Sequence, residues 1–187
     1  QARWDGASPT GLGEEASVAL FNRFQRARFL DPDADFSAPI DLDTRLSTTG
    51  LRVRDRWTLP VLDRLPVTHL GFDVSSDLLR SNDRNGRSRT NLGAYLGETI
   101  PILPDRLDLI GAARLDWTGD FDPKLLPDVA LVATPADWLR IKAQFVGSYR
   151  APTFDELYHP DRGYIRGNPA LDPEEAWAVQ GGVELSL

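Results

Sequence analysis

Arginines that could hold an anion stand at every second position in one part of this chain. Arg52, Arg54 and Arg56 form this run, and Arg114 and Arg140 lie in other alternating stretches. Alternate residues of a β-strand share one face, and a cleft lined by one sign of charge concentrates ions of the other sign. These five arginines are therefore candidate contacts for an anionic ligand. In the alternative interpretation they keep a wet interior solvated and pair with acidic residues such as Asp108, Asp116 and Glu184.

A second candidate is an acidic cluster that could attract a cation. Asp31, Asp33, Asp35, Asp41 and Asp43 fall close together in the sequence. Calcium binds six to eight oxygens, and carboxylates often supply them. The spacing lacks the glycine and the terminal glutamate of an EF-hand loop. We therefore favour a solvated acidic loop over a metal site.

The residue types that support catalysis do not form a recognisable arrangement. His69 and His159 are the two histidines, and neither takes part in a Ser-His-Asp or His-x-x-x-His pattern. We expect His69 to be a polar residue of a wet interior. Cysteine is absent, which removes disulfides and thiolate metal sites. We expect no catalytic residues, no metal site and no cofactor, and hence no enzyme.

The elements that position these residues are predicted to be strands, because apolar and polar residues alternate. The clearest stretch is Trp138–Arg150, where Ile141 and Phe145 share one face and Arg140 and Lys142 the other. We expect about eight strands and no helix. Residues 1–15 read as an irregular lead-in. The expected strands lie near residues 16–30, 51–57, 69–75, 88–103, 107–117, 126–134, 138–150 and 177–187.

The expected connections alternate between long and short. The long loops are Asp31–Leu42, Ser81–Gly86, Gly119–Pro127 and Ala151–Glu175, and the short turns are Pro60–Pro66, Pro104–Asp105 and Pro135–Asp137. Short periplasmic turns and long extracellular loops alternate in this way in outer-membrane β-barrels. This pattern places both chain ends on the periplasmic side.

Bulk composition alone is typical of a soluble acidic protein. The net charge of −7 argues against nucleic-acid binding. The mean hydropathy is −0.32, and no run approaches the ~18 apolar residues of a membrane-spanning helix. A membrane-spanning strand needs only every second residue to be apolar, so a transmembrane barrel and a soluble β-sandwich or small barrel both stay open at this point. In a membrane, the charged faces must point inward, since Arg or Lys costs ~2–4 kcal/mol on the lipid side.

Two linked motifs separate these alternatives. They read Tyr149-Arg150-Ala151-Pro152-Thr153-Phe154-Asp155-Glu156-Leu157-Tyr158 and Gly167-Asn168-Pro169-Ala170-Leu171-Asp172-Pro173-Glu174. These motifs resemble the barrel signature of TonB-dependent outer-membrane receptors, and further stretches near Arg87–Leu96 and Arg106–Trp117 resemble the strands before it. Together the resemblance covers roughly residues 66–187.

We interpret the signature as structural. Pro152 suits the end of a strand because it cannot donate a ladder hydrogen bond. Pro169 and Pro173 keep the following loop from pairing. Arg150 and Glu156 are expected to form a charge-assisted pair at the rim of the barrel.

The resemblance implies a fold and a function. The expected fold is all-β, an antiparallel meandering transmembrane β-barrel segment, with residues 16–187 giving about eight strands of a barrel of about 22 around a plug. The expected function is uptake of a scarce ligand, such as a ferric siderophore or cobalamin, across the outer membrane of a Gram-negative bacterium. A barrel with a purely structural role in the cell envelope is the alternative.

The resemblance also implies partners. These are outer-membrane lipid and lipopolysaccharide, which cations could bridge to the acidic loop, and TonB, through a plug domain outside this chain. Further strands or another polypeptide would complete the barrel. The expected inward charges are too many for a narrow eight-stranded lumen, because each unpaired buried charge is costly. We therefore expect the strands near residues 16–30 and 177–187 not to pair with each other.

Overall fold

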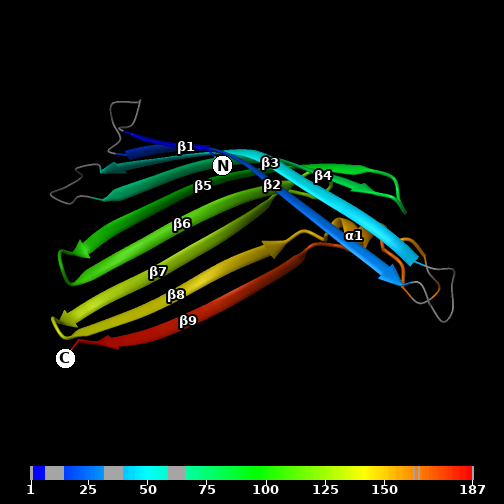
Figure 1. Ribbon diagram of the computed structural model, residues 1–187. Helices are drawn as coiled ribbons and strands as arrows, with labels where there is room; N and C mark the ends of the chain where they lie inside the picture. Colours follow the sequence, from blue (N-terminus) through cyan, green and yellow to red (C-terminus); the bar gives the residue numbers. More distant parts are fainter. Residues whose placement is uncertain are drawn as a thin grey trace.

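The chain folds into one antiparallel sheet whose strands follow the sequence order. The computed structural model describes residues 2–6, 15–31, 40–58, 66–161, 163 and 165–186. Each strand is hydrogen-bonded to its neighbours in sequence, from β1 at one edge to β9 at the other (Figure 1). The strands are β1 (Ala2–Gly6), β2 (Glu15–Asp31), β3 (Ile40–Thr58), β4 (Val67–Ser81), β5 (Arg87–Leu103), β6 (Leu107–Thr118), β7 (Lys124–Ala136), β8 (Leu139–Arg150) and β9 (Glu174–Leu185).

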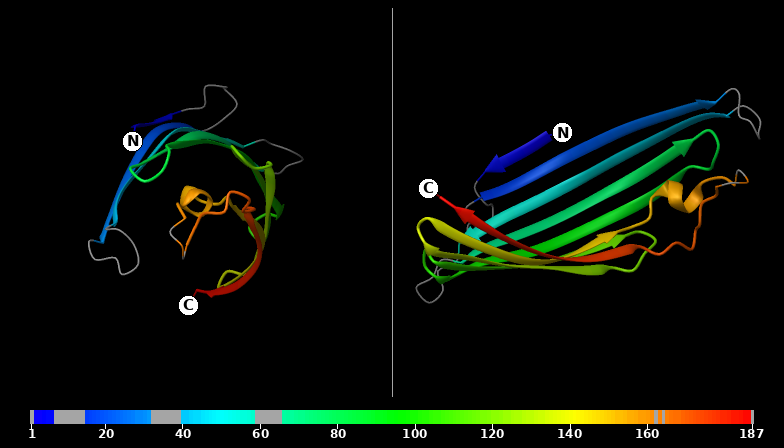
Figure 2. Two further views of the ribbon diagram at one scale, coloured as in Figure 1. Left: turned by 90° about the vertical axis from the view of Figure 1, so that its right-hand side faces the viewer. Right: turned by 90° about the horizontal axis from the view of Figure 1, so that it is seen from below.

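The sheet curves into part of a barrel wall, with a short helix, α1 (Phe154–Tyr158), inside the curve (Figure 2). The strands next to the two edges, β2 and β8, pair only with their sequence neighbours, so β2 does not pair with β9. This confirms that the sheet does not close on itself. None of the helical residues described here forms a segment long and apolar enough to span a membrane.

The register fixes which side chains share a face. Directly opposite residues of an antiparallel pair point to the same side, and the row Arg52, Asp73, Gly93 and Asp116 runs across β3 to β6 in this way. Residues of this row point to the concave side, as does Arg89, which contacts α1. We call the concave side the inner face and the convex side the outer face.

The outer face is apolar along most of its height. Large exposed hydrophobic residues lie on it in β2 and in every strand from β4 to β9, whereas buried hydrophobic residues are few. This distribution is the reverse of a soluble core, in which such side chains are buried. Examples on the outer face are Leu20, Phe72, Leu96, Leu115, Val129, Leu131, Ile141, Phe145, Val179 and Val183.

Several expected elements need correction. Ala2–Gly6 was expected in the irregular lead-in but forms β1, because it finds a partner in β2. The described residues thus form nine strands, and Ala2 lies beside Leu20 in mid-wall rather than at the end with the short turns. The strand β7 begins at Lys124, inside the loop expected at 119–127. The absence of a helix was also wrong, since α1 is present.

Two short turns at one end of the wall, after β5 and after β7, agree with the predictions from the sequence. A tight turn at Pro104–Arg106 joins β5 to β6, with Asp105 at φ 62° and the Arg106 N–H donating to the Leu103 carbonyl at 3.0 Å. The turn after β7 consists of Asp137 and Trp138. The expected turn at Pro60–Pro66 lies outside the described residues except for Pro66.

Candidate functional site on the inner face

The helix α1 begins at a strong local signal in the sequence. Thr153 is its N-cap, and its hydroxyl accepts a hydrogen bond from the Glu156 N–H at 3.2 Å. The Glu156 carboxylate accepts in return from the Thr153 N–H at 2.7 Å. This reciprocal capping box satisfies two N–H groups that a helix start otherwise leaves free. Phe154 and Leu157 point from α1 into the sheet and are buried.

Arg150 ties this helix to the two neighbouring strands. It is the last residue of β8, and its guanidinium binds both oxygens of Glu156 at 3.0 Å. It also binds both oxygens of Glu174, the first residue of β9, at 2.6 and 3.0 Å. Two-point contacts of this kind are the strongest that arginine makes with carboxylates. The expected rim pair between Arg150 and Glu156 is therefore confirmed, with Glu174 added.

The same contacts change the acidity of Glu156. The hydrogen bonds from Arg150 lower the pKa of its carboxyl to about 2, helped by those from the Thr153 N–H and hydroxyl. Glu156 therefore stays ionised across physiological pH. The strap from Arg150 through α1 to Glu174 is held by charge-assisted bonds in that whole range.

The second motif packs against the first one. The Gly167 N–H donates to the His159 carbonyl and the Asn168 N–H donates to the Glu156 carbonyl, both at 2.8 Å. A Cβ on Gly167 would lie 2.6 Å from the Leu157 carbonyl oxygen, so only glycine permits this approach. The two motifs are thus one structural unit that seats α1 inside the curve of the wall.

Beneath α1 lies a cleft of about 510 Å³ lined by two well-buried arginines. Arg89 lies beneath the Phe154 ring, 4.7 Å from its centroid, and donates to the Pro152 carbonyl at 2.7 Å. Arg84 pairs with Asp155 at 2.9 Å, and its side chain is 8% exposed. Both hold α1 against the inner face, and three acidic residues nearby, Asp77, Asp83 and Asp155, balance their charge.

Farther along the inner face, a second group gathers around Arg114. Arg114 binds Asp116 at 2.8 Å and Asp73 at 3.0 Å. It lines a small cleft of about 170 Å³ together with Arg52 and Arg54. No ion pair of Arg52 or Arg54 is found within the described ranges. Arg52 stacks over the Phe21 ring at 5.7 Å.

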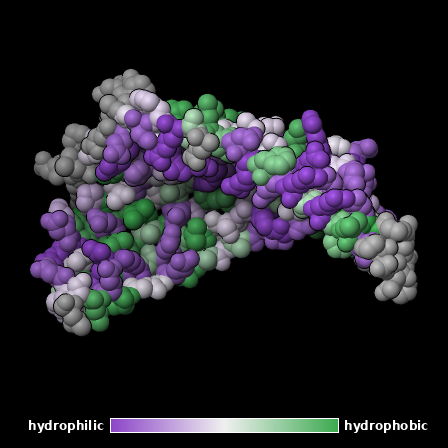
Figure 3. Space-filling view, in the orientation of Figure 1, coloured by the Kyte–Doolittle hydropathy of each residue, from purple (hydrophilic) through white to green (hydrophobic). Residues whose placement is uncertain are grey.

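The structure places all five candidate arginines on the inner face but does not bring all of them together. Arg54 and Arg56 also line a larger cleft of about 750 Å³ with His69, which puts His69 in the interior as expected. Arg140 lies far from this group, 3.7 Å from Glu184. The pairings expected for Asp116 and Glu184 are thus present. Figure 3 looks into this concave face, where hydrophilic side chains surround a hollow.

The described residues of the acidic cluster lie in strands, not in the expected loop. Asp31 ends β2, and Asp41 and Asp43 are part of β3, where each binds arginine. Asp33 and Asp35 lie outside the described residues. Across the described part of the chain, no group of three or more His, Cys, Asp or Glu residues is arranged to hold a metal ion.

Sequence reasoning missed several residues of the inner face. Asp73 stands between Phe72 and Val74, so its side of the strand could be inferred, but Arg89 stands between two polar residues, Ser88 and Thr90. The partners of both residues are far away in the sequence. Gly93 makes room for Arg114, since a Cβ there would collide with that guanidinium. Arg84 lies in the connection between β4 and β5, where no strand alternation indicates the direction of its side chain.

The comparisons with known proteins agree with this geometry. The sequence matches the family described as "TonB dependent receptor-like, beta-barrel" over residues 2–187. No curated protein matches the chain at a significant level.

Solved structures share the fold. The siderophore receptor PirA from Pseudomonas aeruginosa has a TM-score of 0.80 at 18% identity, with 98% of this chain and 34% of that chain covered. A mutant of the ferric enterobactin receptor PfeA from Pseudomonas aeruginosa gives 0.78 at 15% identity, covering 94% and 30%. The copper transporter OprC gives 0.70 at 18% identity, covering 98% and 35%. The chain thus spans about a third of the length of these structures.

Proposed function

The chain belongs to the TonB-dependent receptor-like β-barrel family, and we propose that it is part of an outer-membrane receptor that takes up a scarce, anionic ligand. The exposed apolar outer face would meet lipid. The polar inner face would line the path that a plug domain closes. Energised TonB would act on that plug, and further strands would complete the wall beside β1 and β9.

The observation that carries the ligand class is the pair Arg52 and Arg54. Both are exposed on the inner face, and neither has an ion pair among the described residues. Arg114, beside them, is already neutralised by Asp73 and Asp116. Uncompensated arginines in a cleft with low-dielectric walls attract anions. A ferric siderophore carrying negative charge fits this surface better than a neutral ligand such as cobalamin.

The test uses the intact receptor that contains this chain, produced in cells lacking their own receptors for the probe. Radiolabelled ferric enterobactin, which is anionic, and labelled cyanocobalamin are the two probes. Arg52→Gln with Arg54→Gln should lower uptake of the anionic probe severalfold. Arg106→Gln, which removes a positive charge in the β5–β6 turn, should leave uptake unchanged.

Two results would contradict the proposal. A parent receptor that takes up neither probe, with or without TonB, would favour a structural barrel. If the Arg52→Gln, Arg54→Gln receptor takes up the anionic probe as fast as the parent does, the proposal of an anionic ligand is wrong.

A further inference from the structure

Three arginines form a row across the outer face of the wall. Arg26 on β2 lies directly opposite Arg45 on β3, and Arg45 lies directly opposite Arg80 on β4. All three side chains are exposed. Like charges directly opposite each other in a sheet are destabilising. The row therefore needs neighbouring anions to offset this repulsion, and the carboxylates of the sheet provide only some of them.

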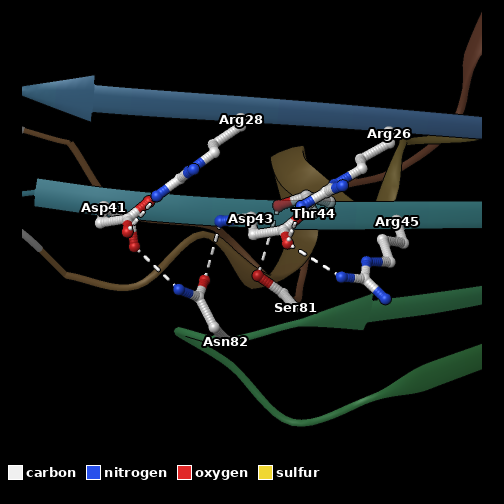
Figure 4. Close-up of polar contacts among 8 residues, drawn as sticks. All are labelled: Arg26, Arg28, Asp41, Asp43, Thr44, Arg45, Ser81 and Asn82. Atoms are coloured by element: carbon white, nitrogen blue, oxygen red, sulfur yellow. Dashed lines mark hydrogen bonds and ion pairs between the residues drawn. The ribbon is translucent and has the colours of Figure 1, made fainter.

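The carboxylates beside the row are too few to neutralise it. Asp43 binds Arg26 at 2.8 Å and Arg45 at 3.1 Å (Figure 4). Asp41 is occupied by Arg28, through two contacts of 2.8 and 2.9 Å. Arg80 has no ion pair within the part of the chain that the structure describes. The outer face here carries four arginines against two aspartates.

The row lies at a defined height on the wall. On β3 the outer face is charged at Asp55 and again at Arg45, and the residues between them are Val53, Leu51, Thr49 and Ser47. Ten residues of a strand tilted by about 40° rise roughly 25 Å, which is the height of the apolar band of outer-membrane barrels. The arginine row therefore stands one row above Phe24 and Leu78, at the level of lipid headgroups.

The polarity of β3 reverses at this same height. Below the row, apolar side chains point outward. Beside and above it, Leu46 and Leu42 point inward, toward the cleft under α1, and Ile40 is buried. The outer face above the row carries Asp41 and Asp43. This reversal is expected where a wall leaves lipid and enters water.

We propose that Arg26, Arg45 and Arg80 bind the phosphate groups of the phosphorylated glycolipid of the outer leaflet, lipopolysaccharide. The proposal rests on the outer-membrane location proposed above, with the long loops outside. The planar fork of arginine matches phosphate oxygens at two points. Adjacent strands lie about 4.8 Å apart, so the row offers three such forks over roughly 10 Å.

The neighbouring polar residues preorganise the row. Asp43 holds the guanidinium groups of Arg26 and Arg45 in place without saturating them. Asn82 donates to the Asp41 carbonyl at 2.8 Å and accepts from the Asp43 N–H at 2.9 Å, which fixes the end of β4 against β3. Arg80 is therefore held beside Arg45 on a rigid element.

The experiment measures lipid binding to the purified intact receptor in detergent. The probes are diphosphorylated lipid A, the same lipid after enzymatic removal of its phosphates, and inorganic phosphate. The test variants are Arg80→Gln and the triple change Arg26→Gln, Arg45→Gln and Arg80→Gln. Arg23→Gln is the matched control, because Arg23 is an exposed arginine on the inner face of β2 with no ion pair among the described residues.

We expect diphosphorylated lipid A to bind the parent and the Arg23→Gln receptor equally. The triple variant should bind it at least about tenfold more weakly, and Arg80→Gln should fall in between. Dephosphorylated lipid should bind all four proteins as weakly as the triple variant does. Equal binding of lipid A by parent and triple variant, or competition by inorganic phosphate at the same concentration as the lipid, would overturn the proposal.

The two proposals fail separately. If the receptor takes up the anionic probe but the triple variant binds lipid A as tightly as the parent, only this inference is overturned. A barrel that binds lipid A through the row but transports neither probe overturns only the transport function.

Discussion

Arg114 reaches across β5 to bind Asp73, with 3.0 Å between its Nη2 and the Asp73 Oδ1. The two residues are on β6 and β4, and Gly93 lies between them on β5. A Cβ at Gly93 would collide with the guanidinium and would come within 2.8 Å of the Asp73 carboxylate. The absence of a side chain on the middle strand therefore permits a contact between two strands that are not neighbours.

This arrangement predicts that Gly93→Val destabilises the wall. The branched side chain must displace Arg114, so the ion pair is lost and crowding adds to the cost. We expect the free energy of unfolding of the intact receptor, measured with urea in lipid vesicles, to fall by about 1–3 kcal/mol. Gly182→Val is the control, since Gly182 is also on the inner face and a Cβ there meets nothing within 4 Å. Equal losses at both positions would contradict this explanation.

The facing of β8 gives a second prediction. Phe145 is on the outer face, stacked on Trp177 with 5.5 Å between ring centroids, and Gln144 is on the inner face, donating to Asp128 at 2.7 Å. Phe145→Arg places a charge against lipid and should cost ~2–4 kcal/mol of unfolding free energy in vesicles. Gln144→Arg keeps Asp128 as a partner and should cost far less. Similar costs for the two changes would mean that the outer face does not meet lipid.

The strap through α1 should loosen in acid. The folded pKa of Glu156 is about 2, below its ordinary value of 4.5, so its contribution is complete above about pH 4.5 and is lost as the pH falls toward 2. Hydrogen–deuterium exchange of Phe154–Tyr158, corrected for intrinsic rates, should therefore speed up over that window. Glu156→Gln should exchange fast at every pH, whereas Asp172→Asn, in the exposed loop before β9, should behave like the parent. A pH-independent exchange rate in the parent would contradict this role.

Much of the wall could be predicted from alternation, and the failures have physical causes. The strands in the stretches Leu51–Val74 and Trp138–Arg150 could be predicted because residues of the outer face and residues of the inner face contrast sharply in polarity. The sequence pattern places residues 40–42 in a loop and leaves residues 43–50 without an element, because the polarity of this part of β3 is reversed: Leu42 and Leu46 face inward to pack under α1. A search for one continuous apolar face therefore misses a strand whose apolar side changes from the outer face to the inner face along its length.

The site was predictable only in its local part. The Arg150–Glu156 pair is six residues apart in one motif and was expected from it. The Thr153-x-x-Glu156 capping box that starts α1 lies in the same motif, but no helix was expected there. The contacts of Arg114 with Asp73 and of Arg89 with Pro152 depend on the register of distant strands. The register follows from pairing across the sheet, and one strand's sequence does not determine it.

The last prediction concerns orientation in the membrane. The connection that carries α1 and the β4–β5 connection leave one end of the wall, whereas the β5–β6 and β7–β8 turns leave the other. If the long connections are extracellular, a cysteine at Asp172 or Asn82 should react with an impermeant maleimide on intact cells. A cysteine at Asp137, whose side chain is 96% exposed, should react only after the outer membrane is permeabilised. The chain has no cysteine of its own, so labelling within it reports the introduced position. Reaction of Asp137→Cys alone on intact cells would invert the wall, and the arginine row would then face the periplasmic leaflet, where lipopolysaccharide is absent.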